Sequence, residues 1–418
     1  MNTTSPGKEA AYDDGAVGVY LHLPYCERVC PYCDFAVIAA RRIEPEVEAR
    51  YVEALLVELA ARQPDFAGRS LASIYFGGGT PALFEPESIA RLCEAIRAAF
   101  PTAPGSGEDE VEVTLELNPS TLERERLPGF RAAGVNRLSI GVQSFDDAQL
   151  KRLGRAHRAK VIDETLAAAR ASGFDNLSLD LIFAGPEQSR ADLDRDLERM
   201  IEFGPEHIST YELTFEPETP FGRALASGQM EACDEDQAAE MIEQIESRLT
   251  LSGYERYEIS SYARPGRRAR HNARYWQRQA VLGLGLGAHS TEARSPSHPH
   301  GARRSNPRAL DDWLAALERD PARAGALEGL PVESARGEAV FLALRQPEGL
   351  DAARFAAEFG APPRTFFAGP IRELCRRGWL VESDRGDLRL SAAGRLLADS
   401  VAAEFVAEEG GVAETAAD

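Results

Sequence analysis

The chain has 418 residues and a net charge of −20, from 47 basic and 67 acidic side chains. This length suggests at least two domains, and the charge argues against sequence-independent binding of DNA or RNA, which needs cations to neutralise phosphates. No run approaches the ~20 apolar residues of a membrane-spanning helix. The polar N-terminus has the features of neither a signal peptide nor a transit peptide, so we expect a cytoplasmic protein.

Residues 1–15 are predicted to be a disordered tail. Beyond them, apolar strand-like runs alternate with amphipathic helical stretches. The predicted strands are residues 17–23, 73–76, 111–117, 137–142, 177–183, 207–214 and 254–261. The predicted helices between them include residues 46–62, 88–100, 159–171 and 191–203. This alternation predicts an α/β fold with a parallel sheet, whose binding sites lie at the carboxyl ends of the strands.

The stretch from about residue 294 to 307 is rich in Ser, Pro, Arg and Gly and is predicted to be a loop or linker. We assign residues 16–310 to a core domain, 325–406 to a C-terminal module and 407–418 to a second disordered tail. The module has predicted helices at 333–345, 350–359, 370–377 and 392–405, and a hairpin formed by 379–382 and 387–390. This pattern resembles a winged helix, and the acidic charge favours packing or partner docking over DNA binding.

Three of the six cysteines, Cys26, Cys30 and Cys33, have the spacing Cys-x3-Cys-x2-Cys. Three such thiolates can hold three irons of a four-iron cluster and leave the fourth iron open to a chelator such as S-adenosylmethionine. A disulfide suits a secreted chain, which this one does not resemble, and structural zinc needs a fourth ligand. A chance triplet of buried cysteines is the other alternative. The remaining cysteines are isolated and are predicted to be structural.

Polar residues and glycines recur at the predicted strand ends. Gly78, Gly79 and Thr80 follow the second strand, where glycine lets backbone amides approach a ligand, although a tight turn explains the run equally well. Glu116 and Gln143 end the next two strands. Both can hydrogen-bond a ligand there, or they are ordinary polar residues at the ends of strands.

Three further residues are candidates for a site. Asp180 lies inside an apolar strand, and a buried carboxylate needs partners. Arg155 could bind a ligand carboxylate as a fork or form an ordinary salt bridge. His271 lies in His-Asn-Ala-Arg-Tyr-Trp and is a candidate ligand of haem iron, although other histidines compete. The alternating glycines of residues 283–287 lack a dinucleotide-binding context and are predicted to let the backbone pass close to a ligand or neighbour.

In combination and in order, these motifs resemble the radical S-adenosylmethionine proteins related to oxygen-independent coproporphyrinogen III oxidase. The motifs are the cysteine triplet, Gly-Gly-Gly-Thr-Pro, Glu-Leu-Asn-Pro, Gly-Val-Gln-Ser-Phe, Leu-Gly-Arg-x-His and His-Asn-x-x-Tyr-Trp. The resemblance implies a partial (β/α)6 barrel with a C-terminal winged-helix-like module. True oxidases of this family carry a further cysteine where this chain has Phe35. This position, the short N-terminal arm and His-Asn-x-x-Tyr-Trp resemble the haem chaperone branch of the family.

The resemblance also implies roles for individual residues. Cys26, Cys30 and Cys33 would hold a [4Fe-4S] cluster. The residues implied to contact the cluster-bound S-adenosylmethionine are Tyr20, Gly78 and Glu116. The residues that match a second such site in the oxidase are Tyr32, Gly79, Thr80, Gln143, Arg155 and Asp180. Haem could use that second space in this chain. The family's Tyr-Gly-Leu-Pro after the Asp180 strand is replaced here by Phe-Ala-Gly-Pro, which leaves the loop shape open.

The implied function is a haem chaperone that passes haem to respiratory proteins at the membrane. Its implied partners include an electron donor such as a flavodoxin or ferredoxin, and a partner could bring it to the periphery of the inner membrane. The alternative is an enzyme that oxidatively decarboxylates coproporphyrinogen III to protoporphyrinogen IX, against which Phe35 counts. A third alternative, nucleic-acid modification through the C-terminal module, is disfavoured by the charge. The sequence leaves open the haem acceptor, the number of S-adenosylmethionine molecules, their cleavage and the oligomeric state.

Overall fold

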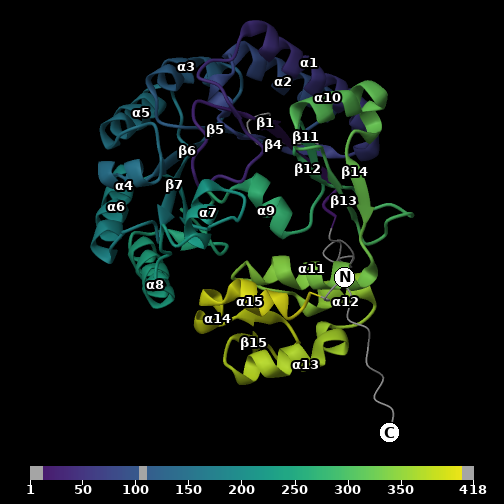
Figure 1. Ribbon diagram of the computed structural model, residues 1–418. Coiled ribbons are helices and arrows are strands. Elements are labelled where there is room, and N and C mark those ends of the chain that lie inside the picture. Colours follow the sequence, from purple (N-terminus) through teal and green to yellow (C-terminus); the bar gives the residue numbers. More distant parts are fainter. Residues whose placement is uncertain (1–12, 103–110, 407–418) are drawn as a thin grey trace, which may run out of the picture.

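The structure is a computed structural model that describes residues 13–102 and 111–406. A curved, mostly parallel sheet has helices along its outer side, and a smaller, mainly helical module packs against one end of this core (Figure 1). The predicted tails at 1–12 and 407–418 lie outside the described residues. Asp13 and Asp14, which we also predicted to be disordered, instead form ion pairs with Arg69 and Arg274.

Six parallel strands form the centre of the sheet and follow one another in chain order. They are β1 (Ala16–Leu23), β4 (Ser70–Gly78), β5 (Glu112–Leu117), β6 (Arg137–Gln143), β7 (Leu177–Phe183) and β8 (His207–Glu212). A seventh parallel strand, β11 (Val281–Leu284), pairs with the free side of β1. The predicted α/β partial barrel is therefore confirmed, and the carboxyl ends of its strands meet at one edge.

Most helices of the core lie outside the sheet (Figure 1), and local sequence sets their ends. Pro45 and Pro86 are the first residues of α1 and α2, where a missing amide hydrogen costs nothing. Ser189 and Asp192 form a capping box before α6, which ends at Gly204 with φ of 58°. The bounds are α1 (Pro45–Arg62), α2 (Pro86–Ala99), α3 (Thr121–Ala132), α4 (Asp147–Arg152), α5 (Ala159–Ala171), α6 (Arg190–Phe203), α7 (Pro220–Ala226), α8 (Glu235–Leu251), α9 (Arg270–Trp276) and α10 (Leu310–Arg319).

The prediction of one strand over residues 254–261 was wrong. The segment contains two short antiparallel strands, β9 (Glu255–Arg256) and β10 (Ser261–Ala263). The guanidinium of Arg256 donates to the carbonyl of Ile259 at 2.8 Å and holds the intervening chain in a turn. An apolar pattern does not reveal a side chain that binds the carbonyls of its own turn.

The prediction of a loop over residues 294–307 was also wrong in part. Residues 302–305 of this segment form β13 (Ala302–Ser305), which extends the sheet between two further antiparallel strands, β12 (His289–Thr291) and β14 (Ala326–Gly329). Arg304 of β13 is largely buried, and its guanidinium pairs with Glu292 at 2.8 Å. This ion pair lets a charged residue lie in a strand, so a strand forms where the composition predicted a loop.

The core continues beyond residue 310, where the predicted core domain ends. β14 belongs to the large sheet, and Trp313 of α10 lies in the main hydrophobic cluster. A separate cluster, which includes Val340, Phe355 and Leu388, forms the centre of the C-terminal module. The division into domains at 16–310 and 325–406 stays a prediction, and packing puts the start of the module near residue 330.

The C-terminal module combines helices with one hairpin, as predicted. Its elements are α11 (Val332–Leu344), α12 (Ala352–Phe359), α13 (Pro363–Arg376), β15 (Leu380–Glu382), β16 (Leu388–Leu390), α14 (Ala392–Leu396) and α15 (Ala398–Ala403). The third helix begins earlier than predicted, with a kink at Phe367. The predicted last helix is interrupted at Leu397, whose φ of −118° and ψ of 27° are not helical.

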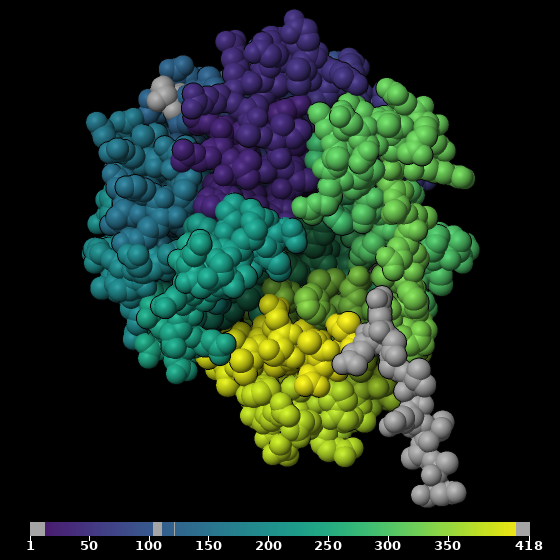
Figure 2. Space-filling model, viewed as in Figure 1, coloured from purple at the N-terminus to yellow at the C-terminus, as the bar shows by residue number. Residues whose placement is uncertain are grey.

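Figure 2 shows the face on which the module, in yellow, meets the teal and green parts of the core around a hollow. The cysteine region, in purple, lies on the same face, above the teal segment. Short 3₁₀ turns complete the fold at Gln63–Phe66, Pro81–Leu83 and Pro321–Arg323. Within residues 13–102 and 111–406, no helix is both long and apolar enough to span a membrane.

Candidate functional site

The three cysteines lie on one loop, residues 26–37, which we call the cysteine loop and which follows β1. Two-residue strands at its ends, β2 (Tyr25–Cys26) and β3 (Ile38–Ala39), pair in parallel and hold the loop closed. The amide of Ala40 donates to the carbonyl of Cys26 at 2.7 Å. The loop is therefore fixed at its base, while all three cysteines stay half-buried and unbridged.

Two side chains from the barrel reach the cysteine sulfurs. Thr80 Oγ1 donates to Cys26 Sγ at 3.5 Å, and Arg155 Nη1 donates to Cys30 Sγ at 3.4 Å. Donors of this kind, one of them cationic, stabilise a thiolate. No three His, Cys, Asp or Glu side chains among the described residues converge tightly enough to hold a single metal ion. A cluster does not require that convergence, because each of its irons takes its own cysteine.

The glycine run at the end of β4 is packed against the end of β1. Gly78 has φ of +103°, and a Cβ there would lie 2.4 Å from the ring of His22. The amide of Gly79 donates to Leu23 O at 2.9 Å and that of Thr80 to Tyr25 O at 2.8 Å. A Cβ on Gly79 would lie 2.6 Å from the carbonyl carbon of Pro24, so positions 78 and 79 both need glycine because His22 and the backbone approach so closely.

Glu116, at the end of β5, is held by two donors. Tyr75 Oη donates to Glu116 Oε1 at 2.7 Å, and the amide of Gly78 donates to Oε2 at 3.1 Å. The ring of Tyr20 stacks on that of Tyr75, with centroids 6.1 Å apart. Burial raises the pKa of Glu116 to about 7; the Tyr75 hydrogen bond opposes this shift and the charge of Asp180 adds to it.

Several polar atoms inside the barrel are buried and lack a partner among the described residues: Gln143 Oε1, Asp180 Oδ1 and Arg155 Nε. Asp180 Oδ2 accepts a long hydrogen bond from Ser139 Oγ at 3.4 Å, and burial raises the pKa of Asp180 to about 6 although hydrogen bonding to Ser209 opposes the shift. Gln143 has φ of +67°, a strained value for a residue other than glycine. Buried polar atoms without partners in this part of the barrel indicate room for a polar ligand.

Asn118 connects these groups, and our sequence analysis did not select it. Its Nδ2 donates to Thr80 Oγ1 at 2.8 Å, and its Oδ1 accepts from Arg155 Nη2. Arg155 Nη2 also donates to Gly141 O at 2.9 Å. Cys30, Thr80, Asn118 and Arg155 line one pocket of about 170 Å³. The signal was present, since Asn118 belongs to the Glu-Leu-Asn-Pro motif.

Comparisons with known proteins assign this site to a family. Residues 20–200 match the radical SAM superfamily and residues 330–397 match the HemN C-terminal domain. The chain is 32% identical over 391 residues to the heme chaperone HemW of Bacillus subtilis, covering 93% of this chain and 99% of that one. It is 39% identical over 273 residues to the heme chaperone HemW of Escherichia coli, covering 65% and 69%. The chain belongs to the HemW family.

A solved structure supports the fold of this HemW family member. The coproporphyrinogen III oxidase HemN of Escherichia coli, described as a radical SAM enzyme, superposes with a TM-score of 0.79 at 24% identity. The match covers 94% of this chain and 90% of HemN. Membership of the radical SAM superfamily implies a [4Fe-4S] cluster and S-adenosylmethionine. The cysteine loop and the buried polar atoms around it fit these groups chemically.

Tyr32 lies beside this site and packs against Phe221, with ring centroids 6.2 Å apart. Burial raises the pKa of Tyr32, and the charge of Arg155 opposes that shift. The predicted residues other than His271 thus come from the cysteine loop, from strands β1 and β7, from the ends of β4, β5 and β6, and, for Arg155, from the segment after α4. The structure brings Tyr20, Gly78 and Glu116 together.

His271 does not lie at an open position in this member of the family. Its ring is 1% exposed, with Nδ1 2.9 Å from Ser73 Oγ and Nε2 3.3 Å from Tyr275 Oη. Glu112 accepts from the amides of Arg270 and His271 at 3.0 Å each and so caps α9. Both ring nitrogens are engaged, so the predicted role of His271 as a haem ligand has no support in its geometry.

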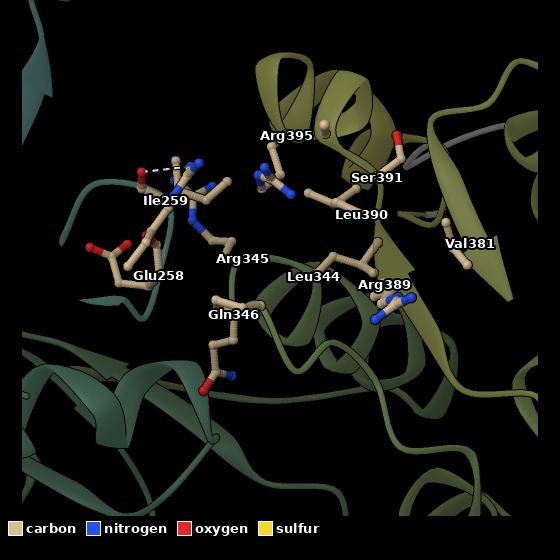
Figure 3. A pocket seen from close by; sticks show the side chains of 13 residues that line it. Glu258, Ile259, Leu344, Arg345, Gln346, Val381, Arg389, Leu390, Ser391 and Arg395 are labelled. Carbon is tan, nitrogen blue, oxygen red and sulfur yellow. Dashed lines mark hydrogen bonds between the residues drawn. The ribbon is translucent and has the colours of Figure 1, made fainter. Parts of the chain in front are cut away.

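A second pocket, of about 240 Å³, lies between the core and the module (Figure 3). Three of its arginines are paired within the protein. Arg256 and Arg395 both bind Glu246, at 3.0 Å each, and Arg345 binds Asp399 at 2.5 Å. The pair of Arg395 with Glu246 joins the module to α8, so this pocket marks a contact between two parts of the chain.

Proposed function

We propose that this protein is a haem chaperone. It binds haem, a [4Fe-4S] cluster and S-adenosylmethionine, and it transfers haem to respiratory acceptor proteins at the membrane. The full-length relation to the heme chaperone HemW of Bacillus subtilis carries this proposal, because it spans 99% of that protein. Phe35, which stands where the oxidases carry a further cysteine, supports it.

Cys26, Cys30 and Cys33 would each hold one iron of the cluster. Arg155 would lie beside the Cys30 thiolate and offset part of the negative charge of the site. When bound, the cluster supplies the electron that cleaves the sulfonium of S-adenosylmethionine. A flavodoxin or ferredoxin would reduce the cluster, and the half-buried cysteine loop leaves room for such a donor.

Tyr20, Gly78 and Glu116 would bind the S-adenosylmethionine nearest the cluster. Tyr32, Gly79, Thr80, Gln143, Arg155 and Asp180 would line the space beside it. Burial raises the pKa values of Glu116 and Asp180 although the charge of Arg137 opposes both shifts, so a ligand with an ammonium and a sulfonium group complements them. The amides of Gly79 and Thr80 already donate to the backbone, so these two residues would shape the site rather than offer their amides.

The second candidate is oxygen-independent coproporphyrinogen III oxidase. One observation favours it: the fold of HemN extends over 94% of this chain. At 24% identity that likeness concerns the fold alone, and Phe35 again counts against the oxidase. The two candidates differ in what they do with a tetrapyrrole, because a chaperone returns it unchanged and an oxidase removes two carboxylates.

The experiment uses anaerobically reconstituted full-length protein. One arm titrates it with haem and follows the Soret band; the other adds reductant, S-adenosylmethionine and coproporphyrinogen III and follows decarboxylation. Stoichiometric haem binding without decarboxylation is the expected result. Decarboxylated product would establish the oxidase instead, and the absence of a saturable Soret change would overturn the chaperone proposal.

A further inference from the structure

The geometry singles out one histidine that faces solvent. All seven histidines of the chain lie in described residues. Their exposures differ sharply: His22, His157, His207 and His271 are buried, His298 and His300 are half-buried, and His289 is exposed. An imidazole can bind an incoming haem iron only if one ring nitrogen is accessible and has a free lone pair. This requirement excludes the four buried histidines as they are placed.

The ring of His289 is oriented by one hydrogen bond. His289 begins β12, and its Nδ1 lies 3.0 Å from Ser305 Oγ on β13. With Nδ1–H donating to that hydroxyl, the lone pair of Nε2 is left for a ligand, which is how metal-binding histidines are usually fixed. Partial burial and the charge of Arg308 lower the pKa of His289, which favours the neutral form of the ring.

His289 also lies close to the cysteine loop. It follows the glycine turn after β11, where a Cβ on Gly287 would come within 2.9 Å of Ala36 Cβ. From the next segment, Arg308 Nη2 donates to the carbonyl of Asp34 at 2.5 Å. Phe35 lies between these two contacts in the chain and is 68% exposed. An exposed imidazole and an arginine that acts on it therefore lie beside the segment of the cysteine loop that carries the exposed ring of Phe35.

We propose that His289 Nε2 would ligate the iron of the haem that this protein binds. Phe35 packs against the porphyrin face, and Arg308 pairs with a propionate carboxylate. Haem presents this combination of iron, apolar face and carboxylates. The side chain of Arg308 is 62% exposed, and its Asp34 carboxylate partner lies 3.6 Å away, so it can reach an added anion. This inference rests on the proposed haem binding and names the residue that carries it.

The test compares two variants, His289→Ala and His298→Ala. His298 is the control because it is half-buried and also follows β11 in the chain. Both variants and the unmodified full-length protein are reconstituted and titrated with haem, with visible and EPR spectra of the iron. We expect His289→Ala to lose the histidine-ligated spectrum and to bind haem at least tenfold more weakly, while His298→Ala behaves like the parent. Added imidazole should restore the spectrum of His289→Ala. Unchanged cluster absorbance shows that the barrel is intact.

A second variant distinguishes loss of the iron ligand from a folding defect caused by the substitution. His289→Met keeps a ligand for iron, so we expect haem to bind with a spectrum shifted towards methionine ligation. Unchanged haem spectra and affinities in both His289 variants would overturn this inference and leave the proposed function intact. A parent protein that binds no haem would overturn both. Loss of the spectrum in His271→Ala, with His289→Ala unaffected, would transfer the role to His271.

Discussion

Arg155 joins the cysteine loop to the barrel. Its two terminal nitrogens contact Cys30 Sγ, Asn118 Oδ1 and the carbonyl of Gly141. A planar guanidinium can serve these three directions at once, whereas an ammonium on a flexible stem cannot. The side chain therefore sets the position of Asn118, and through it that of Thr80 and Cys26.

Arg155→Lys should weaken S-adenosylmethionine binding about tenfold or more, which corresponds to ~1.4 kcal/mol. The charge is kept, but the link between Asn118 and Gly141 is lost. Equilibrium binding to the reconstituted protein measures this change. Arg152→Lys is the matched control, because Arg152 is exposed on the preceding helix and forms an ion pair with exposed Glu187. Equal affinities in the two variants would show that the fork of Arg155 is not needed.

Cys30→Ser should abolish the absorbance of the reconstituted cluster, because serine does not replace a thiolate ligand of iron. Cys233→Ser is the control, since Cys233 is half-buried and lies far along the chain from the cysteine loop. Iron content and the visible spectrum after anaerobic reconstitution are the measurements. A full cluster in Cys30→Ser would contradict the ligand assignment.

Glu58 makes the stability of the cluster-free protein depend on pH. It is fully buried and accepts from the Gly285 amide, Asn306 Nδ2 and Trp313 Nε1, and burial raises its pKa to about 7. The folded state thus holds a proton that the unfolded state releases above its ordinary pKa of 4.5. Stability from this group falls as pH rises, by about 1 kcal/mol between pH 6 and 8.

Glu58→Gln should reduce that fall, while the exposed Glu53→Gln on the same helix should not. Denaturant unfolding at pH 6 and pH 8 gives the two free energies of unfolding for each variant. Since Glu58→Gln also places an amide among hydrogen-bond donors, its absolute stability drops at both pH values. A pH dependence identical to that of the parent would contradict the assignment.

The ends of β1, β4 and β5 lie so close together that the glycine positions at the end of β4 leave no room for a side chain. Gly78 shows this most clearly, because its hypothetical Cβ overlaps the His22 ring while its amide binds Glu116. The glycine run is thus a consequence of three strands converging on one edge. The same convergence brings the cysteine loop, Glu116 and Asn118 within reach of one another.

Gly78→Ala should destabilise the protein by several kcal/mol and weaken S-adenosylmethionine binding, because both the positive φ and the contact with His22 oppose a methyl group. Gly134→Ala separates the two causes. Gly134 has φ of +94° but nothing within 4 Å of its would-be Cβ, so we expect a loss of about 1 kcal/mol. Thermal and denaturant unfolding measure both. Equal losses in the free energy of unfolding would mean that the His22 ring moves away from a methyl group at position 78 at no energetic cost.

Buried ion pairs attach the C-terminal module to the core. Arg278, which is 3% exposed, binds Glu338 at 2.8 Å and Glu358 at 3.0 Å, both on the module. Arg294 and Arg303 of the core add contacts to the same two carboxylates. Charges this deeply buried are costly to leave unpaired, so they favour one docking arrangement of the module over others.

Arg278→Met should cost about 3 kcal/mol and expose the connection near residue 330 to protease. The control is Arg268→Ala: Arg268 also reaches the module, through Glu348 at 3.0 Å, but that pair is half-exposed and should contribute less than ~1 kcal/mol. Unfolding curves and limited proteolysis compare the variants. Equal effects would show that burial of the Arg278 network does not fix the module.

The core strands and the cysteine motif could be predicted from the sequence because each depends on residues that are close together in the chain. Residues 177–183 form one apolar run, and β7 has those bounds. The strand at 302–305 escaped prediction because its arginines are neutralised by residues elsewhere in the chain, such as Glu292 for Arg304. Asn118 escaped selection because its importance lies in contacts with Thr80 and Arg155, from two other segments.

The amino-acid sequence by itself determined the α/β class, the cysteine loop, the glycine-bearing strand ends and the family. Each depends on periodicity, residue type or spacing within a few residues of one another. Only the tertiary structure decided that His271 is buried between Ser73 and Tyr275 while His289 is exposed beside the cysteine loop. Exposure depends on which distant segments pack over a side chain, and spacing along the chain does not record that packing.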